Sequence, residues 1–371
     1  MRRIIKYIHE LPAWPQFHWN EKSFAHLLAE VRHRQGRVLG KMESLGLSLQ
    51  AEASLHSLTV EVVKSGEIEG EILNPDQVRS SIARKLGLKI AGLIPAERHV
   101  DGVVEMMLDA TQHYNEPLTA KRLFSWHAAM FPAGTSAMRK IVVGKWRNNR
   151  KDDPMQVVSG AMGKEKIHFQ APDAEILKDE MKKFFDWFNQ TNNIDPVLKA
   201  AIAHFYFVTI HPFDDGNGRI ARAIADLQLA RADSTSQRFY SMSAQIRKER
   251  NDYYNMLEQT QKGTPDITKW IEWFLHCLYR ALMATDETLA LVLHKARFWE
   301  KHAKTVFNAR QVTLLNKLPD GFAGNLTSSK WAKIAKCSQD TALRDIQDLA
   351  DKKILAKESA GGRSTNYVLV D

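Results

Sequence analysis

The most informative stretch of this chain reads H-P-F-D-D-G-N-G-R-I-A-R and runs from His211 to Arg222. An apolar run from Ala201 to Ile210 precedes it and a helical pattern follows it, which predicts a loop between two helices. The pair Asp195-Pro196 is typical of a helix start and places the first helix directly before the loop. A glycine-rich loop that opens a helix beside a histidine and two carboxylates indicates a catalytic loop that handles phosphate, so we expect an enzyme.

The second half of the loop is suited to binding a phosphate chain. Gly216, Asn217 and Gly218 allow a tight turn, and the free N–H groups of the helix that begins there favour an anion. Arg219 and Arg222 are three residues apart and share a helix face, so both can bind the same phosphates. A di- or triphosphate is therefore the expected ligand.

The first half of the loop supplies the reactive groups. An ordinary histidine pKa of about 6.5 suits His211 to act as a general base toward a hydroxyl. Asp215 is placed to hold a Mg²⁺ ion that bridges phosphate oxygens. Phe213 is expected to anchor the loop in the core, and Asp214 to be a solvated loop carboxylate.

These residues match the signature of the Fic family (filamentation induced by cAMP), His-x-Phe-x-Asp/Glu-Gly-Asn-Gly-Arg-x-x-Arg, at every fixed position. The resemblance implies a helical Fic core that transfers AMP from ATP to a Ser, Thr or Tyr hydroxyl of a target protein and releases pyrophosphate. It implies that His211 activates the hydroxyl, that Asp215 ligates Mg²⁺, and that the glycines and arginines hold the phosphates.

The segment from Met155 to Phe169 resembles the family's flap, a hairpin that aligns the target by β-augmentation. Two short strands are predicted around a turn at Gly160 to Gly163. The expected docking residues on these strands are Val157, Val158, Ile167 and His168. The alternative is an ordinary surface hairpin.

The segment that follows the loop resembles the part of the family that closes over the nucleotide. Tyr253 or Tyr254 is a candidate for lining the adenine pocket, and Gln261 for offering it an amide. Core packing is an equal alternative for either tyrosine.

A short run before the loop resembles the Fic inhibitory motif, Ser/Thr-x-x-x-Glu-Gly/Asn, with Ser65, Glu69 and Gly70 at the fixed positions. The resemblance implies that Glu69 pairs with Arg222 and makes ATP bind in an unreactive pose. On its own, such a run is usually a solvated helix end. The alternative role for Glu69, known in some members of the family, is to position a water that removes AMP from a modified target, and the sequence does not separate these roles.

Sparse glycine and proline and long periodic segments predict a mainly α chain with three parts: an N-terminal helical extension at 1–85, a catalytic domain at 86–290 and a C-terminal domain at 300–371. We expect helices over Glu21 to Leu45, Leu49 to Val63, Asp101 to His113 and Ile267 to Ala284, a helix starting at Pro172, and a strand at Ile141 to Val143.

The C-terminal domain resembles a winged helix-turn-helix, with helices over Leu326 to Ala335 and Gln339 to Lys352, followed by two strands. The second helix, counted with the residue after it, carries four acidic residues against three basic ones, which is unfavourable for phosphate-driven DNA affinity. A protein-interaction or dimer-positioning role is favoured over DNA binding. A DNA-binding regulator with a nucleotide-sensing site is the competing hypothesis.

The bulk composition narrows the class of protein further. The 371 residues carry a formal net charge of +9 and are 44% hydrophobic, typical of a globular protein with anionic partners. Cys277 and Cys337 lack the spacing of a zinc site or a disulfide framework. No apolar run has the length of a membrane span, so a cytoplasmic protein without a membrane partner is expected. The helical faces would allow a homodimer.

Overall fold

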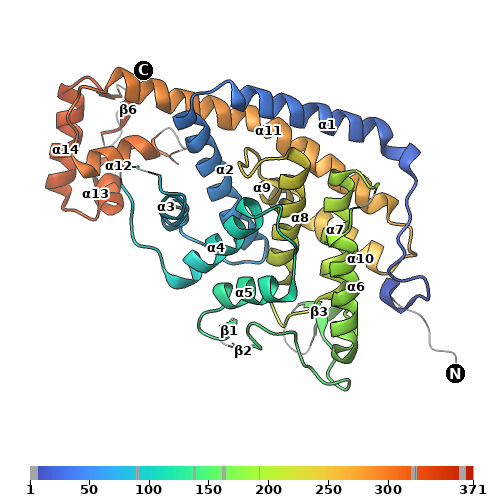
Figure 1. Cartoon of the computed structure of the whole chain (residues 1–371). Coiled ribbons are helices and arrows are strands. Elements are labelled where there is room, and N and C mark those ends of the chain that lie inside the picture. Colours follow the sequence, from blue (N-terminus) through green and yellow to red (C-terminus); the bar gives the residue numbers. More distant parts are fainter. Residues whose placement is uncertain are drawn as a thin grey trace.

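The computed structural model in Figure 1 describes residues 7–88, 90, 92–136, 139–160, 164–191, 193–318, 322, 324–358 and 365–370. It confirms the mainly helical prediction, because helices account for 62% of the chain and the strands are few and short. The described residues contain fourteen α-helices. None of these helices is long and apolar enough to cross a membrane.

The first third of the chain is helical. Its elements are the 3₁₀ turn η1 (Ile8–Glu10) and the helices α1 (Glu21–Glu43), α2 (Leu47–Ile68), α3 (Pro75–Lys85), α4 (Arg98–Gln112) and α5 (Ala120–Met130). Two antiparallel strand pairs follow, β1 (Thr135–Ser136) with β2 (Arg139–Lys140) and β3 (Gln156–Ser159) with β4 (Lys166–Gln170).

The middle of the chain contains η2 (Ala174–Ile176), α6 (Leu177–Asn189), α7 (Pro196–Ile210), α8 (Asn217–Asp233), α9 (Met242–Lys248), α10 (Arg250–Gln261) and α11 (Thr268–Lys301). The C-terminal elements are α12 (Ala309–Lys317), α13 (Ser328–Ala335), α14 (Gln339–Asp351), β5 (Leu355–Lys357) and β6 (Tyr367–Leu369).

The paired helices α7 and α8 form the centre of the core. Every residue of α7 from Val197 to Ile210 is buried, as expected for a helix that is apolar on all sides. The helix starts as the sequence predicts, because the carboxylate of Asp195 accepts a hydrogen bond from the Val197 amide at 2.8 Å and Pro196 occupies the first turn. The loop from His211 therefore leaves a rigid, buried support.

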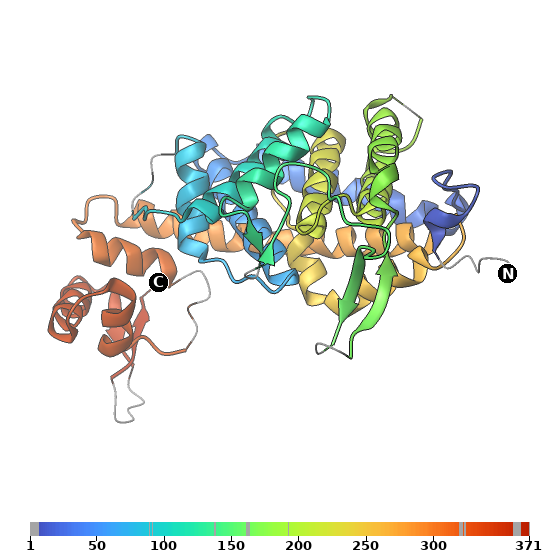
Figure 2. The ribbon, with the colours of Figure 1, turned by 90° about the horizontal axis from the view of Figure 1, so that it is seen from below.

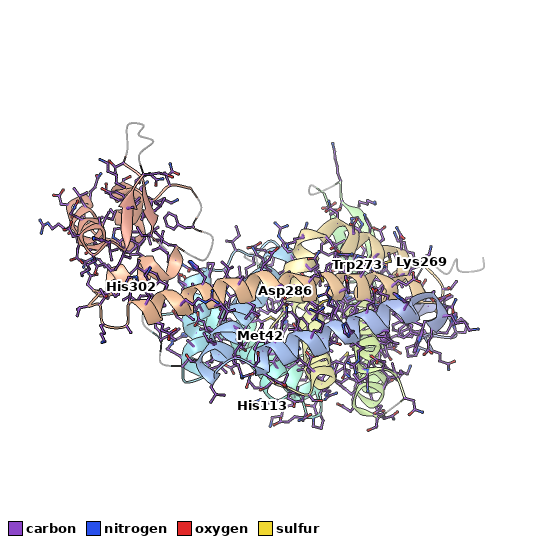
Figure 3. All side chains as sticks on the ribbon, turned by 90° about the horizontal axis from the view of Figure 1, so that it is seen from above. Met42, His113, Lys269, Trp273, Asp286 and His302 are labelled. Atoms are coloured by element: carbon purple, nitrogen blue, oxygen red, sulfur yellow. The ribbon has the colours of Figure 1, made fainter. Side chains whose placement is uncertain are left out.

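Two long helices cover one side of this core. Figure 3 shows α1 and α11 side by side, with Met42 labelled on the first and Asp286 on the second. Lys41 binds Asp286 at 2.5 Å across the pair. Seen from below, the hairpin of β3 and β4 projects from the helical body (Figure 2).

Several local predictions are wrong in detail. Ile141 to Val143 is irregular rather than a strand, because its backbone serves the neighbouring loop: the Val142 amide donates to Asp214. The helix expected from Pro172 begins only at Leu177, after the 3₁₀ turn η2. The helices α2 and α11 extend beyond their predicted ends, α11 as far as Lys301.

The C-terminal residues have a small core of their own, built from α12, α13, α14 and β5 around the buried side chains of Leu314, Trp331, Ile346 and Leu349. The two predicted helices and the two strands are present, and β5 pairs with β6 in antiparallel fashion. Residues 361–363, around which the resemblance to a winged helix-turn-helix places the two strands, lie outside the described residues. The winged-helix assignment therefore stays a prediction.

Candidate active site

The loop between α7 and α8 turns twice through left-handed backbone. His211 ends α7 with φ 53° and ψ 57°, and Gly216 precedes α8 with φ 81°. A Cβ on Gly216 would lie 3.0 Å from both Met130 and Phe131, so both space and conformation require glycine here. The loop is thus closely packed on α5.

His211 is held in the protonation state that a base needs. Its Nδ1 lies 3.2 Å from the Val208 carbonyl, which can only accept, so Nδ1 carries the proton and Nε2 keeps a lone pair. Burial, together with the charge of Arg147, lowers the pKa of His211 to about 4, against the opposing influence of the Val208 hydrogen bond, Asp215 and Glu69. The imidazole is therefore neutral at physiological pH.

Two buried residues that the sequence did not single out bind backbone carbonyls of the loop. The buried side chain of Arg147 donates to the His211 carbonyl at 2.8 Å, and its backbone amide donates to the Pro212 carbonyl at 2.9 Å. His127, fully buried, lies 3.2 Å from the Asp215 carbonyl through Nε2 and accepts from the Gly144 amide at Nδ1. An isolated arginine and an isolated histidine give no sequence signal for such roles.

The His127 ring also fixes the loop's apolar anchor. It stacks on Phe213 with ring centroids 4.3 Å apart and an interplanar angle of 12°. Phe213 is fully buried, which confirms its predicted role as an anchor. Burial lowers the pKa of His127 to about 4, so this ring too is neutral.

The polar side chains of the loop divide into two groups. The Asn217 amide binds both backbone groups of Phe213, at 2.8 and 3.0 Å, so its side chain closes the loop and leaves only its backbone N–H for an anion. Asp214 accepts from the Val142 amide at 2.8 Å and is therefore not the purely solvated carboxylate that we expected. Asp215 accepts from the Gly216 amide at 2.6 Å and from the Ser136 hydroxyl.

The predicted inhibitory residues lie directly against the loop. Arg222, only 2% exposed, binds the Glu69 carboxylate at 2.8 Å. Its Nε and Nη2 donate to the hydroxyl and carbonyl oxygens of Ser65, both at 2.9 Å. Glu69 lies just past the end of α2, and Gly70 follows it with φ 84°, which glycine adopts without strain.

Gly218 makes this approach possible. A Cβ at this position would overlap the Glu69 carboxylate and lie 3.3 Å from Nη1 of Arg222. Tyr254 supports Glu69 from the other side, because its hydroxyl lies 3.2 Å from the second carboxylate oxygen. The end of α2 thus fills the space beside the first turn of α8.

A second carboxylate, which the sequence reasoning missed, binds the other arginine. Glu71 lies 2.5 Å from Nη1 of Arg219, whose guanidinium also lies 5.0 Å above the Phe131 ring. The inhibitory motif ends at Gly70, so it gave no reason to consider the residue after it. Both phosphate-binding candidates are therefore paired with acidic residues of one short segment.

The three residues proposed for the adenine pocket lie in different environments. Tyr253 is buried and its hydroxyl lies 2.8 Å from Nε2 of His204, so it packs in the core beneath Arg222. Gln261 is also buried, with its amide 3.3 Å from the Thr209 hydroxyl. Tyr254 is partly exposed and contacts Glu69 directly, which leaves it as the candidate nearest the loop.

The predicted flap is a hairpin fixed to α10. Val158 and Ile167 pair with each other and are 48% and 40% exposed, whereas Val157 packs toward Phe169. His168 lies 2.6 Å from Glu258 of α10 through Nδ1 and 2.6 Å from the Ser159 hydroxyl through Nε2. His168 therefore ties the hairpin down, while Val158 and Ile167 lie open on its surface.

Comparison with known families assigns two segments of the chain. Residues 117–229 match the Fic/DOC family, and residues 7–88 match a domain of unknown function designated DUF4172. The chain therefore carries a Fic/DOC domain, and the matched segment contains the whole loop from His211 to Arg222.

Curated relatives agree with this assignment. The protein adenylyltransferase Fic of Drosophila grimshawi is 35% identical over 115 residues, which are 30% of this chain and 21% of that protein. The protein of the same name from Nematostella vectensis is also 35% identical over 115 residues, 30% of this chain and 25% of that protein. The chain thus spans a quarter or less of the length of these relatives.

Solved structures confirm the Fic-type helical fold. A Fic family protein from Desulfovibrio desulfuricans G20 has a TM-score of 0.53 at 20% identity, covering 95% of this chain and 97% of that chain. A Fic domain-containing signaling protein from Bacteroides thetaiotaomicron VPI-5482 has a TM-score of 0.52 at 20% identity, covering 70% and 98%. At this identity the likeness concerns the fold alone.

Proposed function

We propose that this chain is an autoinhibited protein adenylyltransferase that transfers AMP from ATP to a hydroxyl of a target protein in the cytoplasm. The observation that carries the proposal is the neutral His211, with Nε2 unprotonated, at the entrance to a helix whose first two turns hold Arg219 and Arg222. The Fic/DOC match and the curated adenylyltransferase relatives support the same reaction.

The chemistry follows from the loop. The target hydroxyl oxygen forms a bond to the α-phosphorus of ATP, and its proton passes to Nε2 of His211. The bond from that phosphorus to the bridging oxygen breaks, and pyrophosphate leaves with the electron pair. The backbone N–H groups that begin α8 and the guanidinium of Arg219 stabilise the departing charge. The protein contributes mainly position and electrostatics.

A magnesium ion fits the donor set of the loop. The Asp215 carboxylate is a hard oxygen ligand beside the start of α8, and it is oriented by Ser136 and the Gly216 amide. Bound there, Mg²⁺ would neutralise charge on the phosphate oxygens. His211 and the arginines retain the roles described above.

Autoinhibition follows from competition for Arg222. Its guanidinium already binds Glu69 and Ser65, and the same donors cannot also bind an outer phosphate of ATP in a productive pose. ATP binding and AMP transfer are thereby separated: the nucleotide enters, but its phosphates lie out of line for attack.

The test uses ATP labelled at the α-phosphate with wild type, Glu69→Gly and Glu69→Gly/His211→Ala. Covalent label on protein is expected to be strong only in Glu69→Gly and absent with the histidine variant. Glu67→Gln is the matched control, because Glu67 lies on the same helix end but pairs with Lys64 and Arg247. It should behave as wild type.

A parallel reaction with ATP labelled at the γ-phosphate separates AMP transfer from phosphorylation, because only α-label stays on the target. No α-label in Glu69→Gly, despite measured ATP binding, would refute the proposed reaction.

The target is proposed to dock on the flap at Val158 and Ile167, whose exposed side chains lie on the projecting hairpin. Val157 and His168 would then support the docking edge from below. We also propose target proteins and a second copy of the chain as partners. Binding of DNA at the C-terminal residues is the alternative that we favour less.

Removal of AMP is the second candidate activity. The Glu69 side chain is 31% exposed beside the loop, so water reaches a carboxylate that can act as a base. Incubating wild type with AMP-labelled target distinguishes this activity, which Glu69→Gly would lose.

A further inference from the structure

A second cationic cavity lies at the opposite end of the α7–α8 pair from the catalytic loop. It has a volume of about 300 Å³ and lies between the residues that follow α4 and those that join α6 to α7. The helices α6, α7 and α8 that frame it stand next to one another in Figure 1. Its lining includes Lys199, Arg231, Gln228, Phe188, Asn115 and Thr191.

Lys199 is a buried amine with a backbone carbonyl and two aromatic rings around it. It is only 6% exposed, and its ammonium donates to the Gln190 carbonyl at 2.8 Å. The rings of Trp187 and Phe188 lie 5.7 and 5.8 Å from it. Burial, followed by repulsion from Arg231, lowers the pKa of Lys199 to about 8.

Arg231, on α8, is partly buried and also donates to backbone carbonyls. Its guanidinium donates to the carbonyls of Tyr114 and Glu116 at 2.6 and 3.0 Å, and lies 3.3 Å from the Gln228 amide oxygen. It also lies 5.0 Å from the centre of the Phe188 ring, which Lys199 faces as well. Burial lowers the pKa of Arg231 to about 10. Among the described residues, neither cation has a carboxylate within 4.0 Å.

Two neighbouring cations in one cavity carry an electrostatic cost that neutral carbonyls do not offset. Burying a charge is unfavourable unless an opposite charge and further hydrogen bonds compensate it. An ammonium has three donors and a guanidinium five, so the bonds above leave donors on both groups for a ligand. Amide and hydroxyl side chains at Asn115 and Thr191 add further polar groups to the lining.

We propose that this cavity binds a small oxyanion of the phosphate type between Lys199 and Arg231. A volume of about 300 Å³ is at the lower end of ligand pockets, which suits an ion of a few atoms and not a nucleoside triphosphate. The site is separate from the catalytic loop, because the twelve residue steps along α7 from Lys199 to His211 span about 18 Å. Its existence does not depend on the adenylyltransferase proposal.

The experiment measures hydrogen exchange of the full chain with increasing inorganic phosphate, at constant ionic strength set with chloride. Phosphate is expected to slow exchange at 113–117 and 189–199, the two segments that the cations hold. Lys199→Met, which keeps an unbranched apolar stem, should weaken this effect at least tenfold in phosphate concentration. Lys199→Arg, which keeps the charge, should retain it.

Lys182→Met is the matched control, since Lys182 is an exposed lysine of α6 that binds Asp186 outside the cavity. It should respond to phosphate as wild type does. The proposal is overturned if phosphate protects only 216–222, if it protects neither segment, or if Lys199→Met responds as strongly as wild type. In each case Lys199 and Arg231 serve only to bind the carbonyls of the two loops.

Discussion

At the scale of single residues, the site depends on a histidine in an uncommon backbone conformation. His211 is one of four non-glycine residues with positive φ among the described residues, and it ends a helix that is buried along its length. Such conformations cost of order 1–3 kcal/mol and persist where surrounding contacts determine them. Here Arg147 supplies that constraint, because it binds the carbonyls of His211 and of the residue after it.

The protonation state of His211 gives the first prediction. Because burial lowers its pKa to about 4, the ring should stay neutral, with the proton on Nδ1, from pH 8 down to about pH 5. Nitrogen-15 NMR of the imidazole, assigned by comparison with His211→Ala, measures this directly. A ring that titrates near pH 6.5 contradicts the geometry described for the Val208 hydrogen bond.

Gly218 and Gly40 give a matched pair of glycine predictions. Gly218→Ala should lower the thermal stability of the chain, because the new Cβ would overlap Glu69. Gly40 lies inside α1, and no atom lies within 4 Å of a Cβ added there. Gly40→Ala should therefore stabilise the protein by about 0.5–1 kcal/mol. Urea unfolding of both variants measures the two signs. Equal effects would show that helix propensity, not the Glu69 contact, governs position 218.

Sequence reasoning found the residues whose types and spacing carry chemistry, and missed those that act through position. His211, Arg222 and Glu69 belong to motifs, and the structure brings the three together. His127 and Arg147 act by binding backbone carbonyls, and any donor of the right shape at many sequence positions could do so. Only the fold shows which donor reaches the loop.

At the scale of elements, the segment that follows α2 acts as a double clamp on the first two turns of α8. Glu69 binds Arg222 at 2.8 Å, and Glu71 binds Arg219 at 2.5 Å from the opposite side of the turn that Gly70 makes. Both arginines are nearly buried, whereas the two carboxylates are about one-third exposed. The two ion pairs share no residue, so a substitution can remove one pair and keep both partners of the other.

The double clamp predicts unequal effects of two acidic residues. In Glu69→Gly, the added change Glu71→Gln should lower the KM for ATP about two- to five-fold, because a partly exposed ion pair is worth 1 kcal/mol or less. Glu71→Gln alone should remain inactive, since Glu69 still occupies Arg222. Initial rates of AMP transfer at several ATP concentrations test this, with Glu67→Gln as the control. An unchanged KM in the double variant would show that breaking the ion pair between Arg219 and Glu71 costs no free energy when ATP binds.

Secondary-structure elements were predicted most accurately where the hydrophobic period of the sequence repeats several times. The starts of α1 and α7 agree with the sequence, and so do both strands of the flap hairpin. The irregular stretch at Ile141 to Val143 has the β-branched composition of a strand, but its amide group at Val142 binds Asp214 and has no strand partner. Composition alone does not reveal where a backbone hydrogen bond goes.

At the scale of the whole molecule, three histidines are held as neutral rings, of which His127 and His204 are fully buried and His211 is half-buried. Burial lowers the pKa of His127 and His211 to about 4 and that of His204 to about 3. In the unfolded chain each titrates near pH 6.5. Between these values the unfolded state binds more protons, so stability is complete above pH 6.5 and is lost as the pH falls toward the folded pKa values.

These histidines predict a steep acid dependence of stability. The free energy of unfolding should fall by roughly 3–4 kcal/mol per pH unit between pH 6 and 5, at about 1.4 kcal/mol for each histidine. Urea unfolding at several pH values measures the slope. His204→Gln should reduce the slope by about a third, and His26→Gln should not, because His26 is 89% exposed on α1. A slope that His204→Gln leaves unchanged would contradict the neutral burial of that ring.

The missing side chain at position 218 has a genetic consequence. The same space admits the Glu69 carboxylate in the structure and a phosphate in the proposed reaction, so a substitution there removes the clamp and the substrate site together. Selection for a permanently active enzyme therefore has no route through position 218. Gain-of-function alleles should accumulate in codons 65 and 69, whose residues bind Arg222, while alleles in codon 218 should be recessive losses.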